Sequence, residues 1–400
     1  MKYDFTSILD RYGKDAIAVD MPTDYAGSWG KVKREEGFDV IPMWVADMNF
    51  PVAPSIQKAI IDRVNQPTFG YFAPRKEYYE AIIRWQKNHN NADVKQENIG
   101  YDNGVLGGLI SACRVLMSQG DTILVHSPTY VGFTSVLNAN GYKMIHSQLI
   151  NDGETWKMDY EDMEEKIIQN KIHVAIICNP HNPSGRVWTK EELQKAMAIF
   201  EKHNVYVISD EIWSDIILND NKHTPTQSVS EYARTHTVAL YATTKTFSLA
   251  GLVGSYNIIY DPWLRERVNK ESSLSHYNSL NVLTMHGMIG AYSKDGEEWA
   301  RELNEVLSGN INYACDFIKE NLPGVRVIKP EGTYMLFIDC EEYCKKNNVT
   351  LDDVFLKGWK YGVYWQDGRP FHGEYNIRMN LALPLSRVQE AFERLKNFVF

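Results

Sequence analysis

The sequence predicts an α/β protein: a large unit with a mostly parallel sheet between helices, followed by a smaller α+β unit. Three observations support this prediction. Strand-like and helix-like segments alternate from residue 98 to residue 241, which is typical of a parallel sheet with helices on its faces. Long, charged segments with helical character follow between residue 261 and about residue 320. Beyond them, short β-prone segments precede a final amphipathic helix.

The first elements are expected to form an arm and two helices. Residues 1 to about 45 lack long periodicity and contain turn-forming residues, so we expect an arm that lies across a larger body. A helix should begin near Pro54, because proline suits the first turn and isoleucines recur behind it at helical spacing. A second helix is expected around Tyr78, Ile82 and Trp85.

The alternating region predicts six strands with helices between them. The strands are expected at 99–101, 122–125, 142–145, 173–178, 205–209 and 237–241, and the helices at 104–120, 131–140, 159–169 and 189–203. The smaller unit should contain strands at 325–328, 334–338, 362–365 and 375–381 and a helix at 386–397. No internal repeat or flexible linker interrupts this order.

Composition excludes several classes of function. The chain has 400 residues, 44% of them apolar, and 42 basic against 51 acidic residues give a net charge of -9. With no basic run, a nucleic-acid partner is not expected. The amino terminus lacks the apolar core of a signal peptide, and no apolar run is long enough to span a membrane. We therefore expect a cytoplasmic protein without membrane contact.

The cysteines predict neither disulfides nor a metal site. Their number is odd and they are scattered through apparent core segments, which argues against a disulfide framework. Two of them lie four residues apart, but no histidine or further cysteine stands at ligand spacing, so no zinc site is expected. The five are Cys113, Cys178, Cys315, Cys340 and Cys344.

One lysine stands where a ligand is expected. Lys245 follows the predicted strand that ends at Tyr241. Open α/β sheets bind ligands at the carboxyl ends of their strands, and a lysine held there can form a Schiff base. Most lysines are solvated surface charges, so this residue gains meaning only from its neighbours.

Further polar groups follow other strands of the same sheet. Asn182 lies in a turn-rich run after the strand ending at residue 178, and Asp210 directly follows the strand ending at residue 209. Singly, each has a structural explanation, as part of a turn or as a helix cap. Because the strands are predicted to be parallel, these loops should meet Lys245 at one edge of the sheet.

This set fits the ring of pyridoxal 5'-phosphate (PLP). Lys245 would hold the aldehyde, Asp210 would pair with the protonated ring nitrogen, and Asn182 would donate to the phenolic oxygen. Tyr130 follows the strand at 122–125 and offers an aromatic face for stacking.

The phosphate of PLP would bind where a helix begins. Gly104 opens the helix after the first strand, so the backbone N-H groups of Gly104, Val105 and Leu106 are free for an anion. The hydroxyl of Thr244 can add a further donor. We therefore predict PLP as the cofactor and no metal.

Five motifs together resemble fold-type I PLP enzymes of the class I/II aminotransferase superfamily. They are Asn-Pro-x-Asn-Pro-x-Gly at 179–185, Ser-Asp-Glu at 209–211, Thr-Lys-Thr-Phe at 244–247, Pro-Glu-Gly-Thr-Tyr at 330–334 and Arg-Met-Asn at 378–380. Further runs are most similar to the cystathionine β-lyase and cystalysin-like C-S lyases, namely 43–48, 69–71, 245–252 and 255–256. The resemblance covers essentially the whole chain.

The resemblance implies an aspartate aminotransferase-like fold with a seven-stranded-type sheet. It implies an arm at 1–45 that packs with the small domain, a large PLP-binding domain at 46–285 and a small domain at 286–400. Arg378 would bind the substrate α-carboxylate, which the backbone at Ala46 would also approach. Tyr71 would reach the cofactor phosphate of a partner chain, so the resemblance implies a homodimer with shared active sites.

The chain also departs from the usual motifs. Val253 stands eight residues after Lys245, where many aminotransferases carry a phosphate-binding arginine that the lyase group lacks. Val131 stands where cystalysin-like enzymes tend to have a second tyrosine that is thought to help elimination. Trp213 either faces the pocket and reshapes it or packs against the sheet. The other departures are Asn49, Asn103, Thr129 and Ser248.

The resemblance favours α,β-elimination from a sulfur-bearing amino acid such as cystathionine or cysteine, yielding pyruvate, ammonia and a thiol. The main alternative is an aminotransferase acting on an amino acid and a keto acid, because the same lysine serves both reactions. A regulatory or scaffold protein that keeps the fold is a third possibility, which the presence of Lys245, Asp210 and Arg378 disfavours.

Overall fold

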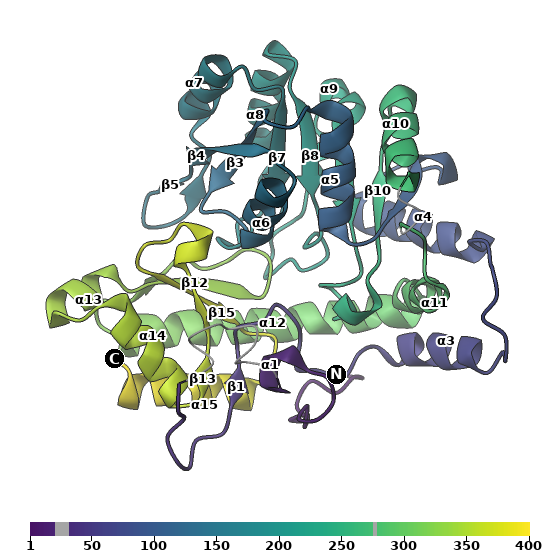
Figure 1. Ribbon diagram of the computed structural model, residues 1–400. Helices are drawn as coiled ribbons and strands as arrows, with labels where there is room; N and C mark the ends of the chain where they lie inside the picture. Colours follow the sequence, from purple (N-terminus) through teal and green to yellow (C-terminus); the bar gives the residue numbers. More distant parts are fainter. Residues whose placement is uncertain (21–31, 275–277) are drawn as a thin grey trace.

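A seven-stranded sheet forms the centre of the larger part of the molecule (Figure 1). The computed structural model describes residues 1–20, 32–274 and 278–400. β10 runs antiparallel to both of its neighbours, and the other six strands share one direction. In spatial order the strands are β2 (Ile99–Asp102), β10 (Ser255–Ile258), β9 (Thr237–Tyr241), β8 (Tyr206–Asp210), β7 (Val174–Cys178), β3 (Thr122–Ser127) and β4 (Lys143–Gln148).

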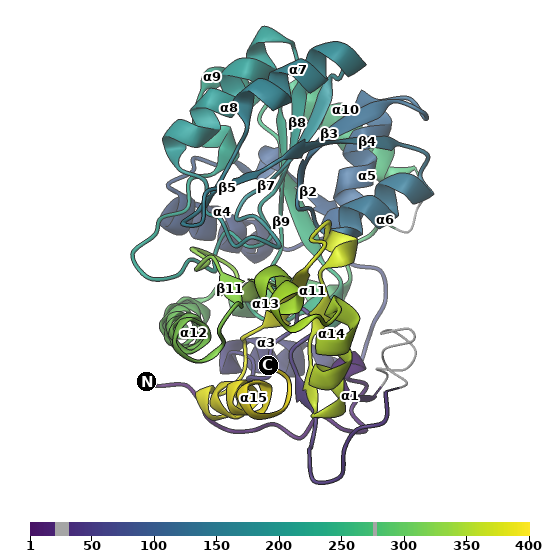
Figure 2. The same cartoon turned by 90° about the vertical axis from the view of Figure 1, so that its left-hand side faces the viewer.

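Helices cover both faces of this sheet (Figure 2). One face packs against α5 (Val105–Leu116), α6 (Val131–Ala139) and α10 (Pro262–Ser273), and the other against α7 (Tyr160–Asn170), α8 (Lys190–Lys202) and α9 (Glu231–Thr235). Alternation along the strands explains the two cores. In β7, Val174 and Ile176 face the first set of helices, whereas Ala175 and Ile177 face the second.

Local capping explains where several helices begin. The side chain of Asp159 accepts a hydrogen bond from the backbone of α7, and Thr189 forms a capping box with Glu192 at the start of α8. By contrast, α5 begins after Gly104, which has φ +77° and supplies no side-chain cap. The first N-H groups of α5 are therefore left for another acceptor.

A four-stranded antiparallel sheet forms the core of the C-terminal part. Its strands are, in spatial order, β11 (Arg326–Val327), β12 (Met335–Asp339), β15 (Asn376–Asn380) and β14 (Gln366–Asp367). Three helices belong to the same part: α13 (Glu341–Asn347), α14 (Leu351–Lys360) and α15 (Leu385–Phe398). The long helix α12 (Lys294–Asn321) runs beside both parts (Figure 1).

The amino-terminal arm folds back onto the C-terminal part. Its strand β1 (Ile41–Pro42) pairs in parallel with β13 (Val363–Tyr364). The short helix α1 (Ile17–Asp20) precedes it, and residues 21–31 of the predicted arm lie outside the described residues. The helices α3 (Pro54–Val64) and α4 (Lys76–Asn90) follow the arm in the chain, and α11 (Val282–Ala291) packs against both of them. The strands β5 (Ile150–Asn151) and β6 (Trp156–Lys157) pair as a small antiparallel hairpin.

The predicted fold class is confirmed, with differences in detail. The strands β1, β5, β6, β10 and β14 and the helices α1, α9, α13 and α14 were not predicted. The predicted strand at 362–365 corresponds to β13, which pairs with β1 of the arm. The helix predicted to continue to residue 120 ends at Leu116, because Met117 has an extended backbone. Within the described ranges, no helix is long and apolar enough to cross a membrane.

Candidate active site

A cavity of about 870 Å³ lies at the carboxyl edge of the seven-stranded sheet. It lies beside β15 and the arm, which contribute part of its wall. Ten of the predicted site residues line it: Ala46, Gly104, Val105, Leu106, Tyr130, Asn182, Asp210, Thr244, Lys245 and Arg378. Tyr71 does not line this cavity, and its side chain is fully exposed in this chain.

Lys245 presents its amine to the cavity from a tightly anchored turn after β9. Its Nζ donates a hydrogen bond to the carbonyl oxygen of Ala46 at 2.9 Å. The next two residues hold the turn, because Thr246 donates to Asp215 at 3.0 Å and Phe247 is buried. Burial, reinforced by the charge of Arg378, lowers the pKa of Lys245 to about 8. A neutral amine is therefore accessible near neutral pH.

Asp210 ends β8 as a buried acid. Its Oδ1 accepts a hydrogen bond from the backbone of Ile212 at 3.1 Å. Burial, with a smaller contribution from the charge of Glu211, raises the pKa of Asp210 to about 7. Within the described part of the chain no cationic side chain is ion-paired with it, so a cation in the cavity would stabilise its charged form.

Arg378 projects from the centre of the four-stranded sheet and is buried. Its Nη1 donates to Oδ1 of Asn182 at 3.2 Å, its Nη2 donates to Gln366, and the guanidinium lies 4.4 Å from the ring centroid of Phe371. Burial lowers the pKa of Arg378 to about 10. Its Nε has no partner among the described residues, and no carboxylate there neutralises the group. A carboxylate ligand would satisfy both needs.

The remaining predicted residues provide a cradle and a stacking face. The start of α5 has no side-chain cap, and Val105, Leu106 and Thr244 line the cavity. The N-H of Gly104, also predicted to be free for an anion, instead donates to the carbonyl oxygen of Asp102 at 2.9 Å. Tyr130 precedes α6 and packs edge-on against Phe133 at 5.4 Å. These groups suit an anion and a flat ring.

Trp213 faces the cavity, which is the first of the two interpretations given above. The residue lines the cavity, and its ring centroid lies 5.6 Å from Nζ of Lys245. Its ring packs edge-on against Tyr334 at 4.7 Å. Val131, Asn103 and Ser248 also line the cavity, whereas Thr129 is buried beside it and Asn49 contacts the arm.

Several residues of the site were missed in the sequence. Arg11 and Asp47 form an ion pair of 2.5 Å on the cavity wall, and Tyr334 donates to the carbonyl of Ala46 at 3.0 Å. Gln366 contacts Arg378 because the two residues are opposite each other in β14 and β15. No local motif marks Arg11 or Gln366, since their partners are distant in sequence. Tyr334 closes the motif at 330–334, but this motif does not predict its contact with Ala46.

The residues present fit PLP. Asp210 is a buried acid that needs a cation, Arg378 has an orphaned donor, and α5 offers uncapped N-H groups beside the amine of Lys245. A protonated pyridine ring, a substrate carboxylate and a phosphate are the complementary groups.

Comparisons with known proteins agree with this fit. The model of the family "Aminotransferase class I and II" matches residues 39–395. Cystathionine beta-lyase PatB of Bacillus subtilis (strain 168) is 33% identical over 371 residues, 92% of this chain and 95% of PatB.

Two solved structures are closely similar in fold. A PLP-bound C-S lyase from Staphylococcus hominis has a TM-score of 0.89 and 30% identity, covering 99% of this chain and 98% of the lyase. A PLP-bound "putative aminotransferase" from Clostridium difficile 630 has a TM-score of 0.90 and 35% identity, covering 99% of both chains. Together with the geometry of the cavity, these matches show that the chain belongs to the aminotransferase class I and II family of PLP-dependent enzymes.

Proposed function

We propose that the protein is a C-S lyase that performs α,β-elimination on cystathionine-like or cysteine-like amino acids. The products are pyruvate, ammonia and a thiol. The observation that carries the proposal is the amine of Lys245, with its pKa lowered to about 8, in one cavity with Asp210 and Arg378. This set can bind an amino acid and remove its α-proton.

Each residue has a role that follows from its contacts. Bound PLP supplies an electron sink for negative charge at the substrate α-carbon. Asp210 would hold the ring nitrogen in its protonated form, and the start of α5 with Thr244 would hold the phosphate. Arg378 would bind the α-carboxylate through its unpaired donor. Lys245, as the neutral amine, would take the α-proton.

The choice of elimination rests on the relatives. PatB and the Staphylococcus protein are named as lyases, and this chain has Val253, exposed at the cavity rim, where many aminotransferases carry arginine. The Clostridium protein supports the alternative of transamination. In that reaction, Lys245 would return the proton to the cofactor and a keto acid would be needed for turnover.

One experiment separates the two reactions. The PLP-loaded protein is offered L-cystathionine or L-cysteine without any keto acid, and pyruvate is followed with lactate dehydrogenase. The proposal expects sustained pyruvate release that disappears in Lys245→Ala. Conversion of amino acids only after a keto acid is added, with no pyruvate from either sulfur compound, would replace it with the aminotransferase.

The proposal includes a cytoplasmic homodimer with shared active sites. Apolar side chains are exposed on and near the loop after α3, as expected for a surface that a second copy covers. They are Ile61, Val64, Phe69, Tyr71 and Phe72. All five cysteines are free, which is in keeping with a reducing compartment. Sedimentation of the purified protein tests the dimer.

A further inference from the structure

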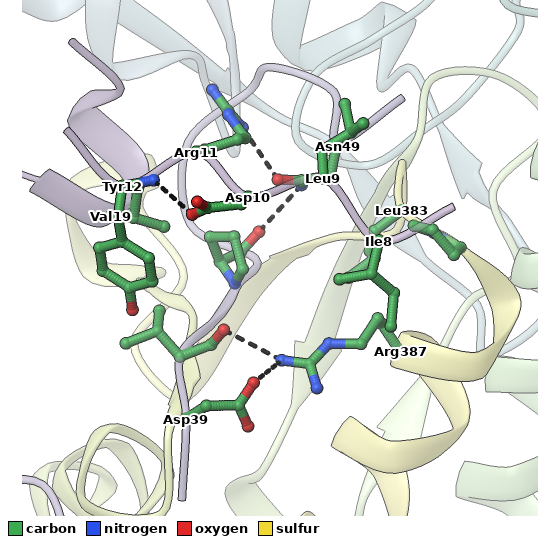
Figure 3. Close-up of a pocket in the computed structure, with 13 residues that line it drawn as sticks. Ile8, Leu9, Asp10, Arg11, Tyr12, Val19, Asp39, Asn49, Leu383 and Arg387 are labelled. Carbon is green, nitrogen blue, oxygen red and sulfur yellow. Dashed lines mark hydrogen bonds and ion pairs between the residues drawn. The ribbon is translucent and has the colours of Figure 1, made fainter. Parts of the chain in front are cut away.

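Arg11 of the amino-terminal arm lies between two cavities. It lines the active-site cavity and also a smaller one of about 200 Å³ formed by the arm and the start of α15. In Figure 3 the guanidinium of Arg11 is directed toward Asn49 and away from Arg387 and Asp39 at the other end of the small cavity. The guanidinium also pairs with Asp47, which lines the active-site cavity, so the charged end of Arg11 lies at the wall of that cavity.

A single carboxylate, that of Asp47, balances the charge of Arg11. Its Nη2 lies 2.5 Å from Oδ2 of Asp47, and its Nη1 donates to Oδ1 of Asn49 at 2.9 Å. Asn49 accepts this hydrogen bond without a negative charge. Among the described residues, Asp47 is the only acid in ion-pair contact with Arg11, and none accepts a hydrogen bond from its Nε.

The pair remains open to solvent. The side chains of Arg11 and Asp47 are 19% and 21% exposed, so a ligand in the cavity can reach both charges. Asp47 directly follows Ala46, whose carbonyl oxygen accepts from the amine of Lys245. The charges therefore lie on the wall next to the reacting amine. Arg378 enters the same cavity from β15.

We propose that Arg11 and Asp47 determine specificity by binding the distal end of the substrate. This inference rests on the proposed function. The fitting substrate is a thioether whose leaving thiol carries its own carboxylate and ammonium group. Arg11 binds the distal carboxylate through its planar donors, and Asp47 binds the distal ammonium. Arg378 is left to the α-carboxylate. An amino acid with a short, uncharged S-alkyl group makes only the contact of its α-carboxylate with Arg378.

The test compares two substrates that differ at the distal end. L-cystathionine carries the distal charges, and S-methyl-L-cysteine has the same α-carbon and C-S bond without them. We expect Arg11→Gln to lower the ratio of kcat/KM values, cystathionine over S-methylcysteine, about tenfold or more, mainly through KM. Lys14→Gln removes an exposed charge of the same arm that does not line the cavity, and should keep the ratio.

A second variant tests the charge balance directly. Asn49→Asp places a second carboxylate beside Arg11 and should lower the same ratio while retaining the arm contact. If Arg11→Gln slows both substrates equally, Arg11 only holds the arm and the proposal is wrong. An unchanged ratio in Arg11→Gln, or a raised one in Asn49→Asp, also overturns it.

Binding separates this inference from the proposed reaction. Calorimetry with Lys245→Ala loaded with PLP measures the affinity for both compounds without turnover. The inference expects tighter binding of L-cystathionine than of S-methyl-L-cysteine, and loss of this preference when Arg11→Gln is added. Absence of pyruvate from wild type would defeat the proposed reaction while this measurement still reports on Arg11. Equal affinities in both backgrounds would refute the role of Arg11.

Discussion

Lys245 and Tyr334 donate hydrogen bonds to the same acceptor. Nζ of Lys245 lies 2.9 Å, and Oη of Tyr334 3.0 Å, from the carbonyl oxygen of Ala46. Asn380 donates to the carbonyls on either side of this peptide, those of Val45 and Asp47. The carbonyl of Ala46 is thus held in place from the C-terminal sheet. It accepts a hydrogen bond from Tyr334 as well as from Lys245.

Removal of the Tyr334 hydroxyl should raise the pKa of Lys245. In Tyr334→Phe the carbonyl of Ala46 has one donor fewer, so it stabilises the charged ammonium of Lys245 more strongly. One hydrogen bond corresponds to a shift of a few tenths to about one pKa unit. The measurement is the pH dependence of the rate at which the protein without cofactor binds PLP, since only the neutral amine reacts.

Tyr78 offers a matched control for this variant. It is also fully buried, but its hydroxyl has no partner among the described residues. Tyr78→Phe should therefore leave the midpoint of the rate profile unchanged. A midpoint that stays fixed or falls in Tyr334→Phe would show that the shared acceptor does not influence Lys245.

The buried acid Asp210 should make the cofactor-free protein less stable as pH rises from about 4 to about 7. Its pKa is raised from 3.8 to about 7 by burial. In this window the folded chain keeps the proton and the unfolded chain releases it, so rising pH favours unfolding by up to about 4 kcal/mol.

Asp210→Asn removes this titration. The difference in melting temperature between wild type and variant, both without cofactor, should therefore grow in favour of the variant from pH 4 to pH 7. PLP added to wild type should reduce the fall, because the ring cation stabilises the carboxylate. A difference that is independent of pH would contradict the raised pKa.

The sequence could predict the parts of the site that follow parallel strands. Lys245, Asp210 and Asn182 come directly after apolar runs, and the parallel arrangement brings such ends to one edge. Arg11 and Gln366 could not be found in this way, because long-range folding of the arm and pairing of β14 with β15 bring them to the cavity.

The missed elements have local reasons. The strand β10 has only four residues and includes the polar Asn257, which is buried because it donates to Asp102. A polar residue in so short a run conceals the strand pattern. The start of α14 could have been predicted from the sequence, because Thr350 and Asp353 form a capping box there.

Tyr71 provides a test of shared active sites. Its side chain is fully exposed and does not line the cavity of its own chain. If it serves the partner's cofactor, mixing inactive Lys245→Ala with severely impaired Tyr71→Phe should form heterodimers with one intact site. Random mixing then restores about a quarter of wild-type activity. No recovery after verified subunit exchange would indicate that Tyr71 does not act across the interface.

The identity of residue 131 should decide how the reaction partitions after the α-proton is removed. Val131 lines the cavity beside Tyr130 and has no group that can assist the leaving thiolate. We therefore expect elimination slower than in lyases with a tyrosine there, since one positioned acid-base group contributes on the order of a hundredfold. Transamination should then appear as a side reaction, because slow loss of the thiolate leaves time for protonation at the cofactor. Val131→Tyr should raise the ratio of pyruvate released to cofactor aminated, measured by lactate dehydrogenase coupling and by the absorbance of the cofactor. Val131→Phe adds the ring without the hydroxyl and should leave the ratio near that of wild type; an equal rise in both variants would assign the effect to cavity shape.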